Sequence, residues 1–129
     1  MIREYTDADL SALRRMHAAQ GFGYAFPDLA NPLFLTRLVL EEDAGAPAMA
    51  ALLRLTCEAY LLHDPAAGSP RERWRNLLAM HDAVRADARA RGLEDVHAFL
   101  PPRVERAFGR RLARLGWVRD PWASFCRRV

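Results

Sequence analysis

The segment that most constrains the fold is the tetrapeptide Ser69-Pro70-Arg71-Glu72, near the middle of the 129-residue chain. A serine followed by a proline, and by a glutamate three residues on, is the pattern of a helix start. The serine caps the first turn, the proline takes its first position, and the glutamate reaches back to the cap amide. The residues before this tetrapeptide have strand-like patterns, and those after it have helical periodicity. It therefore predicts where a sheet half, residues 1–68, gives way to a helical half, residues 69–129.

The two halves also differ in charge. The sheet half has five arginines and nine acidic residues, a net charge of −4, whereas the helical half has fourteen arginines and seven acidic residues, a net charge of +7. All 19 basic residues are arginine, which indicates a coding bias, so the number of arginines alone says little about phosphate binding. The asymmetry is typical of a solvated helix face or of an anionic partner.

The totals predict one domain over residues 1–129, because this length can bury a core of its own. The hydrophobic fraction of 51% and the charged fraction of 27% are those of an ordinary globular chain. No apolar run approaches the length of a membrane span, and the first residues do not follow the pattern of a signal peptide. Cys57 and Cys126 lie far apart and fit a reducing compartment. We therefore expect a cytoplasmic protein that does not enter a membrane.

In the sheet half, Thr6 and Asp9 form a second capping pattern before an amphipathic helix. An irregular aromatic segment follows, which is a substrate-facing loop, a short helix or a loop pinned by core aromatics. The expected elements are a strand (1–5), a helix (7–20), the irregular segment (21–33), a hairpin of two strands (34–42 and 47–56) around a turn (43–46), and a third strand (57–63).

In the helical half, the apolar residues after Pro70 recur with a 3.6-residue period as far as Gly92. The expected elements are a helix (70–91), a short strand (95–100), a helix after Pro101-Pro102 that ends at Gly116, and two closing strands (117–119 and 122–128). The order β-α-loop-β-β-β-α-β-α-β-β predicts an α+β fold with a mixed, mostly antiparallel central sheet flanked by helices.

With this order of elements, three segments together resemble the GNAT superfamily of N-acetyltransferases. They are the opening Ile2-Arg3-Glu4-Tyr5-Thr6-Asp7-Ala8-Asp9-Leu10, the hairpin from Leu38-Val39-Leu40-Glu41-Glu42 to Leu52-Leu53-Arg54-Leu55, and the ending Leu112-Ala113-Arg114-Leu115-Gly116-Trp117. The resemblance covers nearly the whole chain. It implies an N-acyltransferase that transfers an acetyl or other acyl group from acyl-CoA to an amine, which belongs to a small molecule or a protein.

The resemblance also implies a place for acetyl-CoA, in a V-shaped opening between the fourth and fifth strands. The pantetheine arm would pair with the backbone of residues 59–63, and the pyrophosphate would lie at the start of the following helix. The implied cofactor-binding residues are Leu61, Leu62, His63, Gly68, Ser69, Arg71 and Arg73.

The helix start departs from the family pattern. Only Gly68 remains of the glycine-rich loop, Pro70 has no N–H, and Glu72 places a carboxylate where the anion should bind. Arg71, Arg73 and Arg75 would offset this by side-chain contacts. Two hypotheses stay open: CoA binding is retained, or the helix is merely well capped.

Candidate catalytic residues lie on the fourth strand. Glu58 is the candidate general base, with Tyr60 on the same face, while Cys57 and His63 lie on the other. The family often places a tyrosine general acid four residues before the glycine that ends its last helix. Leu112 stands there in this chain, so no general acid carries over.

Other site classes find little support. His17, His63, His81 and His97 show no metal-ligand spacing, so no metal is expected, and no P-loop, dinucleotide fingerprint or nucleophile elbow occurs. The arginines of residues 103–128, with nearby aromatic residues, leave nucleic-acid binding as a minor alternative. Besides the amine acyltransferase, the sequence leaves open a GNAT-fold binding or assembly module without CoA, and an acyltransferase acting on tRNA or another anionic substrate. A homodimer is a further expectation.

Overall fold

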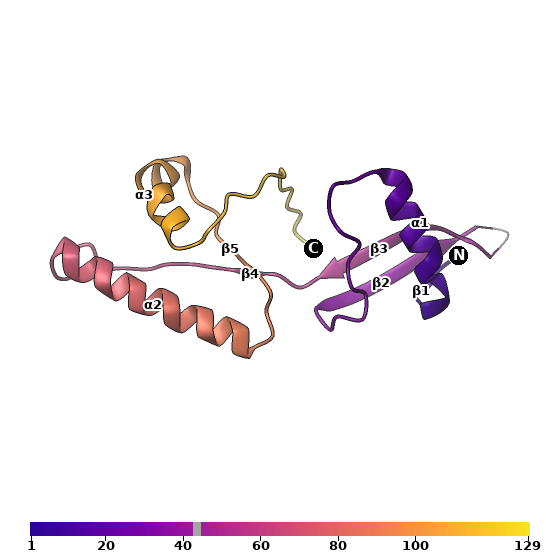
Figure 1. Cartoon of the computed structure of the whole chain (residues 1–129), viewed down its shortest axis with the longest axis horizontal. Coiled ribbons are helices and arrows are strands. Elements are labelled where there is room, and N and C mark those ends of the chain that lie inside the picture. The colour runs from indigo at the N-terminus through magenta and orange to yellow at the C-terminus, as the bar shows by residue number, and fades with distance from the viewer. Residues whose placement is uncertain (43–44) are drawn as a thin grey trace.

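The computed structural model describes residues 1–42 and 45–129, so part of the turn expected at 43–46 lies outside the described residues. The fold is α+β, which confirms the predicted class (Figure 1). In chain order the elements are β1 (Ile2–Glu4), the 3-10 turn η1 (Asp7–Asp9), α1 (Leu10–Gln20), β2 (Phe34–Glu41), β3 (Pro47–Arg54), β4 (Cys57–Glu58), α2 (Pro70–Ala90), β5 (Val96–His97) and α3 (Pro102–Arg114).

The first three strands form an antiparallel sheet with β2 in the centre. In the register, Leu40 of β2 lies between Ile2 of β1 and Met49 of β3. The predicted hairpin is therefore confirmed, although its strands end at Glu41 and Arg54 rather than at residues 42 and 56.

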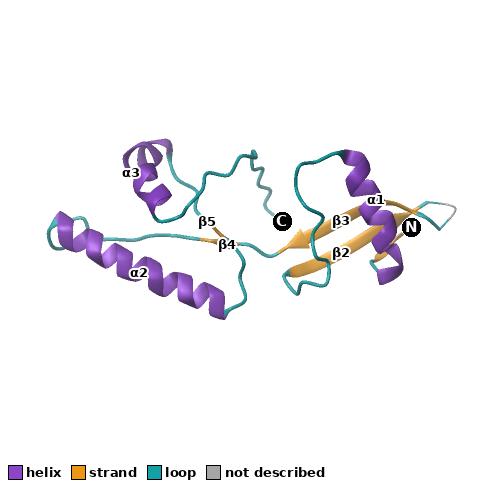
Figure 2. Cartoon of the chain, in the orientation of Figure 1, coloured by secondary structure: helices purple, strands orange, loops and turns teal. Residues whose placement is uncertain are grey.

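The core lies between this sheet and α1, which crosses one face of it (Figure 2). Leu13 of α1 packs with Leu29, Phe34 and Val39, and the Val39 side chain is fully buried. Gly21 ends α1 with a φ of 69°, which glycine adopts without strain. All buried residues among those described lie between positions 9 and 39, so the core belongs entirely to the sheet half.

An ion pair between the partly buried Arg3 and the buried Asp9 joins β1 to the turn before α1. The Asp9 carboxylate accepts hydrogen bonds from both Arg3 Nη atoms, at 2.8 and 2.7 Å, and from the Thr6 amide at 2.8 Å. The last of these bonds belongs to the predicted Thr6–Asp9 capping box, which is confirmed. This network sets where α1 begins relative to the sheet.

From Cys57 onward the chain is arranged differently. β4 and β5 form a separate parallel pair, in which Cys57 lies opposite Val96 and Glu58 opposite His97. The chain leaves β3 through β4 as an extended segment that reaches the start of α2, so α2 and α3 lie at the far end of an elongated molecule (Figure 1).

Several sequence predictions for the residues from Cys57 onward are wrong in extent. The third strand expected over residues 57–63 ends at Glu58, and the strand expected over 95–100 is only Val96–His97. Residues 117–119 and 122–128 are described and form no strand. A strand persists only where a neighbour satisfies its N–H and C=O groups, and the described structure pairs β4 and β5 over two residues each. The one central sheet expected is therefore two sheets.

The sequence predicted a central sheet flanked by helices, and in the described structure α1 is the helix that packs on β1–β2–β3. α1 covers one face of β1–β2–β3, whereas the predicted apolar stripe of α2 contains no buried residue, and its Val84 is half exposed. No helix of the described residues is long and apolar enough to cross a membrane.

Candidate functional site

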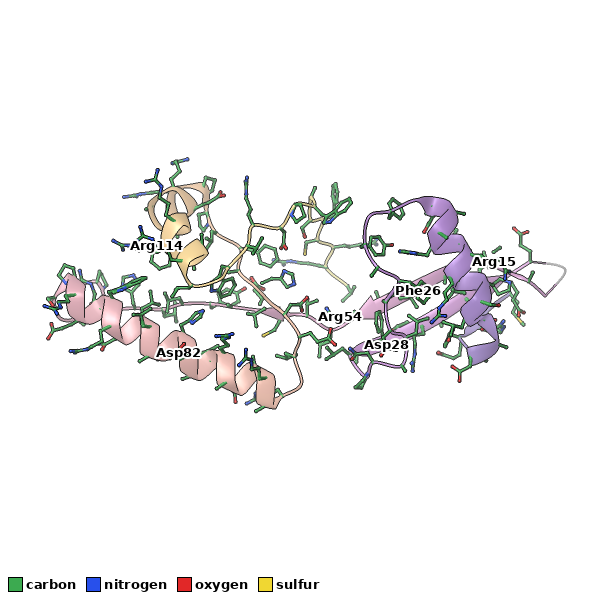
Figure 3. The ribbon with its side chains drawn as sticks, viewed as in Figure 1. Arg15, Phe26, Asp28, Arg54, Asp82 and Arg114 are labelled. Atoms are coloured by element: carbon green, nitrogen blue, oxygen red, sulfur yellow. The ribbon has the colours of Figure 1, made fainter. Side chains whose placement is uncertain are left out.

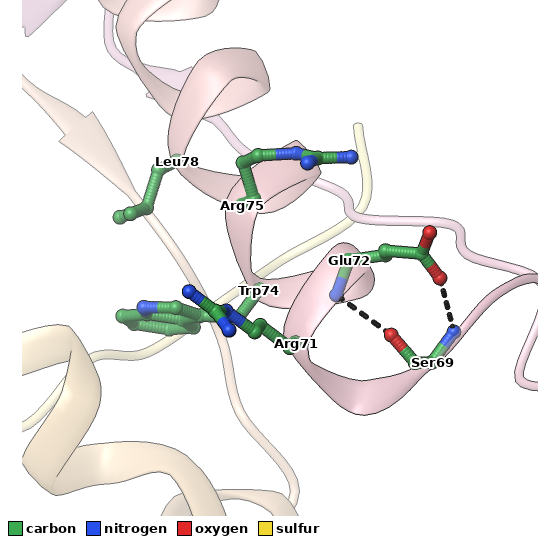
Figure 4. A pocket seen from close by; sticks show the side chains of 6 residues that line it. All are labelled: Ser69, Arg71, Glu72, Trp74, Arg75 and Leu78. Carbon is green, nitrogen blue, oxygen red and sulfur yellow. Dashed lines mark hydrogen bonds between the residues drawn. The ribbon is translucent and has the colours of Figure 1, made fainter.

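The start of α2 is the best-defined part of the candidate site. The Ser69 amide donates to Glu72 Oε2 at 2.7 Å, and the Glu72 amide donates to Ser69 Oγ at 3.2 Å (Figure 4). Pro70 occupies the first position of the helix. The capping box predicted from Ser69-Pro70-Arg71-Glu72 is confirmed.

Gly68 allows the chain to enter this turn. Its φ is 67°, and a Cβ built at this position would lie 3.1 Å from Glu72 Oε2, so a larger residue would both strain the backbone and crowd the cap. Arg73 Nη1 donates to the Gly68 carbonyl oxygen at 2.7 Å. Arg73, a predicted cofactor ligand, is thus already engaged with the chain itself.

The capping box takes the groups that an anion would use. The hydrogen bond from the Ser69 amide is the main reason that the pKa of Glu72 lies below its usual value, so the carboxylate is charged at neutral pH. Pro70 has no N–H, and the Ser69 and Glu72 amides are used inside the box. In the described structure the Arg71 amide is the remaining N–H of this turn without an acceptor. Any phosphate here must be bound mainly by side chains.

Arg71 and Arg75 are available to bind a phosphate through their side chains. A cavity of about 630 Å³ opens beside the helix start, within the size range of small-molecule sites. It is lined by Ser69, Arg71, Glu72, Trp74, Arg75 and Leu78 (Figure 4). The Trp74 ring packs edge-on against Phe108 of α3, with 6.4 Å between ring centroids, and Arg111 lies over its face. α3 therefore fixes one wall of the cavity.

A second feature lies where β4 and β5 separate. The Ala59 amide donates to the His97 carbonyl oxygen at 2.7 Å, and beyond it the described structure pairs residues 60–63 with no strand. Leu61, Leu62 and His63, the predicted contacts of the pantetheine arm, are all exposed on this stretch. Their backbone lies outside the strand pairing of the described structure.

The predicted catalytic pair is also brought together. The Glu58 carboxylate raises the pKa of Tyr60 above its usual value by hydrogen bonding and by its charge. Both side chains are exposed, so neither is held in a desolvated site. They lie at and just after β4, and residues 61–68 separate them from the cavity at α2 (Figure 1).

Sequence reasoning missed a cluster around His97. The His97 Nδ1 atom lies 3.2 Å from Asp120 Oδ2, and Nε2 lies 3.6 Å from Asp95 Oδ2. His97 is also the register partner of Glu58. Asp120 is 23 residues from His97, so no local motif joins the two residues. The cluster places an imidazole with a carboxylate partner at the mouth of the β4–β5 opening.

A third surface gathers aromatic side chains from both ends of the chain. Phe22, Tyr24 and Trp122 line an apolar cavity of about 410 Å³. The rings of Phe22 and Tyr24 are stacked, and His17 meets Tyr24 edge-on, with 4.9 Å between ring centroids. The irregular segment 21–33 contains no helix, and its Phe26 packs against the core, as expected for a loop pinned by core aromatics, while Phe22 and Tyr24 line this cavity.

Among the residues that the structure describes, no three His, Cys, Asp or Glu side chains are placed to hold a metal ion. Comparison of the chain with protein-family models, with curated proteins and with solved structures finds no match.

Proposed function

We propose that this chain is an acyl-CoA-dependent N-acyltransferase, as its resemblance to the GNAT superfamily implies. The observation that carries the proposal is the short parallel pairing of β4 with β5, which ends after two residue pairs and leaves the backbone of residues 60–63 open beside His97. An extended pantetheine arm can add to such a backbone as a strand does, donating and accepting main-chain hydrogen bonds.

The chemistry needs one proton acceptor near the thioester. A neutral amine attacks the thioester carbonyl carbon, a C–N bond forms, the C–S bond breaks, and the thiolate leaves and is protonated from solvent. The amine proton passes to a general base. His97, oriented by Asp120 at 3.2 Å, is the group best placed for this, and Glu58, its register partner, is the predicted alternative.

The phosphates of the cofactor are assigned to side chains rather than to amides. The capping box occupies the amides of the first turn, while Arg71 and Arg75 line the adjacent cavity. Guanidinium groups bind phosphate through paired, charge-assisted hydrogen bonds and need no glycine-rich loop.

Titration with acetyl-CoA and with acetyl-pantetheine, followed by calorimetry, tests this assignment. Replacing both Arg71 and Arg75 by glutamine is expected to weaken acetyl-CoA binding by about 10- to 100-fold, because charge-assisted hydrogen bonds are lost. Acetyl-pantetheine, which lacks the phosphates, should bind equally well to both forms. The matched control is Arg85→Gln, on an exposed part of α2 away from the cavity. If millimolar acetyl-CoA produces no binding heat and no thermal stabilisation of the native chain, the enzyme proposal is refuted.

A second candidate function is a binding or assembly module of the same fold that does not bind CoA. The hydrogen bond between the Ser69 amide and Glu72 favours it, because a carboxylate holds the place of the phosphate.

Glu72→Gln separates the two functions. Glutamine can still accept the Ser69 hydrogen bond, so the cap should persist while the negative charge is removed. For the enzyme, we expect acetyl-CoA to bind about three- to ten-fold more tightly, because a repulsion at short range is relieved. If the chain is a binding module, neither the native chain nor Glu72→Gln should bind acetyl-CoA in the same titration. Acetyl-CoA should then leave the melting temperature of both chains unchanged.

A further inference from the structure

The sheet β1–β2–β3 has one apolar face that α1 does not cover. Ile2, Met49 and Leu53 are 68%, 63% and 63% exposed on it. The register sets Ile2, Leu40 and Met49 side by side across the three strands, so these residues form a continuous apolar row. An exposed apolar face of this kind marks an interaction surface.

α2 carries a matching surface. Leu77, Met80 and Val84 recur at spacings of three and four and therefore lie on one side of the helix. Met80 and Val84 are both at least half exposed. We call this set the α2 stripe. It has the width and chemistry of a helix face that packs on a sheet.

The same chain does not bring these two surfaces together. Arg54, labelled in Figure 3, lies at the end of β3. It pairs with Glu94 at 2.6 Å and with Asp95 at 3.2 Å, and Glu94 also accepts a hydrogen bond from Asn31. These contacts hold the segment between α2 and β5 against the end of the sheet. α2 consequently extends away from the open sheet face (Figure 1).

The exposed area fits a large interface. The chain exposes 11050 Å², whereas a folded monomer of its mass, 14.6 kDa, exposes about 6,900 Å². Obligate interfaces bury about 2,000 to 5,000 Å² over both partners together, so the excess of about 4,100 Å² per chain is more than one such interface requires. Charge points to a partner of the same kind, because the sheet half carries −4 and the helical half +7, so each half is complementary to the other half of a second copy.

We propose that two copies of this chain form a reciprocal dimer, in which the α2 stripe of each copy packs on the open sheet face of the other. The arrangement is closed and two-fold symmetric, and it buries both apolar surfaces of both chains. It follows from exposed area, register and charge, and it does not depend on the proposed acyltransferase activity.

The mass of the particle in solution is measured by light scattering during size-exclusion chromatography of the full chain, at protein concentrations from 1 to 100 μM. We expect about twice 14.6 kDa for the native chain. Met49→Asp on the sheet face and Val84→Asp on the stripe should each raise the dimer dissociation constant by about 100-fold or more, because each buries two unpaired carboxylates per dimer. Ala86→Asp, on the opposite side of α2, is the control and should leave the mass unchanged. Met49 and Val84 are exposed in the single chain, so replacing them should not unfold it. Circular dichroism should confirm that α2 persists in each variant.

Mixing the two variants tests the reciprocal geometry. When Met49→Asp and Val84→Asp chains are refolded together, the heterodimer contains one interface without any substitution, so the mixture should dimerise more strongly than either variant alone. A native chain that stays monomeric at 100 μM overturns the proposal. If Val84→Asp remains fully dimeric while Met49→Asp does not, two sheet faces pack directly on each other, and the reciprocal arrangement is wrong.

Discussion

Replacing Asp9 by asparagine is expected to lower the melting temperature of the chain by about 10 to 20 °C at neutral pH. Asp9 is 4% exposed and is the one buried charged residue among those that the structure describes. Both of its oxygens accept hydrogen bonds from Arg3, and Oδ2 also accepts from Thr6. Asparagine would turn an N–H donor toward the guanidinium and leave the Arg3 charge partly unpaired. Circular dichroism at 222 nm gives the melting temperature.

Asp9 also predicts that the stability of the folded chain decreases at acid pH. The hydrogen bonds from Arg3, followed by that from the Thr6 amide, hold the pKa of Asp9 well below its usual value. A carboxyl whose pKa is depressed in the folded state stabilises that state fully above its unfolded pKa, near 4, and loses this contribution as pH falls through the folded pKa. Melting temperatures measured from pH 7 down to pH 3 should therefore fall more steeply for the native chain than for Asp9→Asn.

Two further variants isolate the geometry of the pair. Asp7→Asn, at an exposed position in the same turn, should change the melting temperature by no more than a few degrees. Arg3→Lys keeps the charge but loses the two-pronged contact, so an intermediate loss is expected. An Asp9→Asn chain as stable as the native one at pH 7 would show that the pair does not fix α1 against β1.

Local patterns in the sequence predicted local structure. The capping boxes at Thr6 and at Ser69 depend on residues three apart, and both occur as expected. The hairpin of β2 and β3 follows from two strand-like runs around a short turn. In each case the interacting groups are close in sequence, so the pattern contains the information that sets the structure.

Longer-range features could not be predicted in the same way. The apolar alternation after Cys57 does not reveal that β4 finds a partner for only two residues, because strand length depends on a neighbour 39 positions away. The contact between His97 and Asp120 likewise has no signature in residue spacing. The apolar period of α2 predicted a buried face, but no residue of α2 is buried in the single chain, because a helical period does not say which surface covers it.

These omissions have one physical origin. The sheet half has a core of its own, whereas the helical half exposes its apolar stripe and its closing aromatic residues. The alternation of apolar and polar residues in the helical half predicts that its apolar side chains are covered by another surface. That surface can belong to the same chain or to a second copy, and the alternation does not distinguish the two. Stability measured at low protein concentration should therefore report mainly on the core beneath α1.

Phe34→Ala is the sharpest test of where that core lies. Phe34 packs with Leu13, Leu29 and Val39, so its truncation should lower the free energy of unfolding by about 3 to 5 kcal/mol, measured by urea denaturation. Phe125→Ala removes the same side chain from a position that is 96% exposed, and below the concentration at which chains associate it should change stability by less than about 0.5 kcal/mol. Equal losses for the two variants would place the C-terminal tail in the core of the single chain. A loss for Phe125→Ala that grows with protein concentration would instead place this residue in the contact between copies.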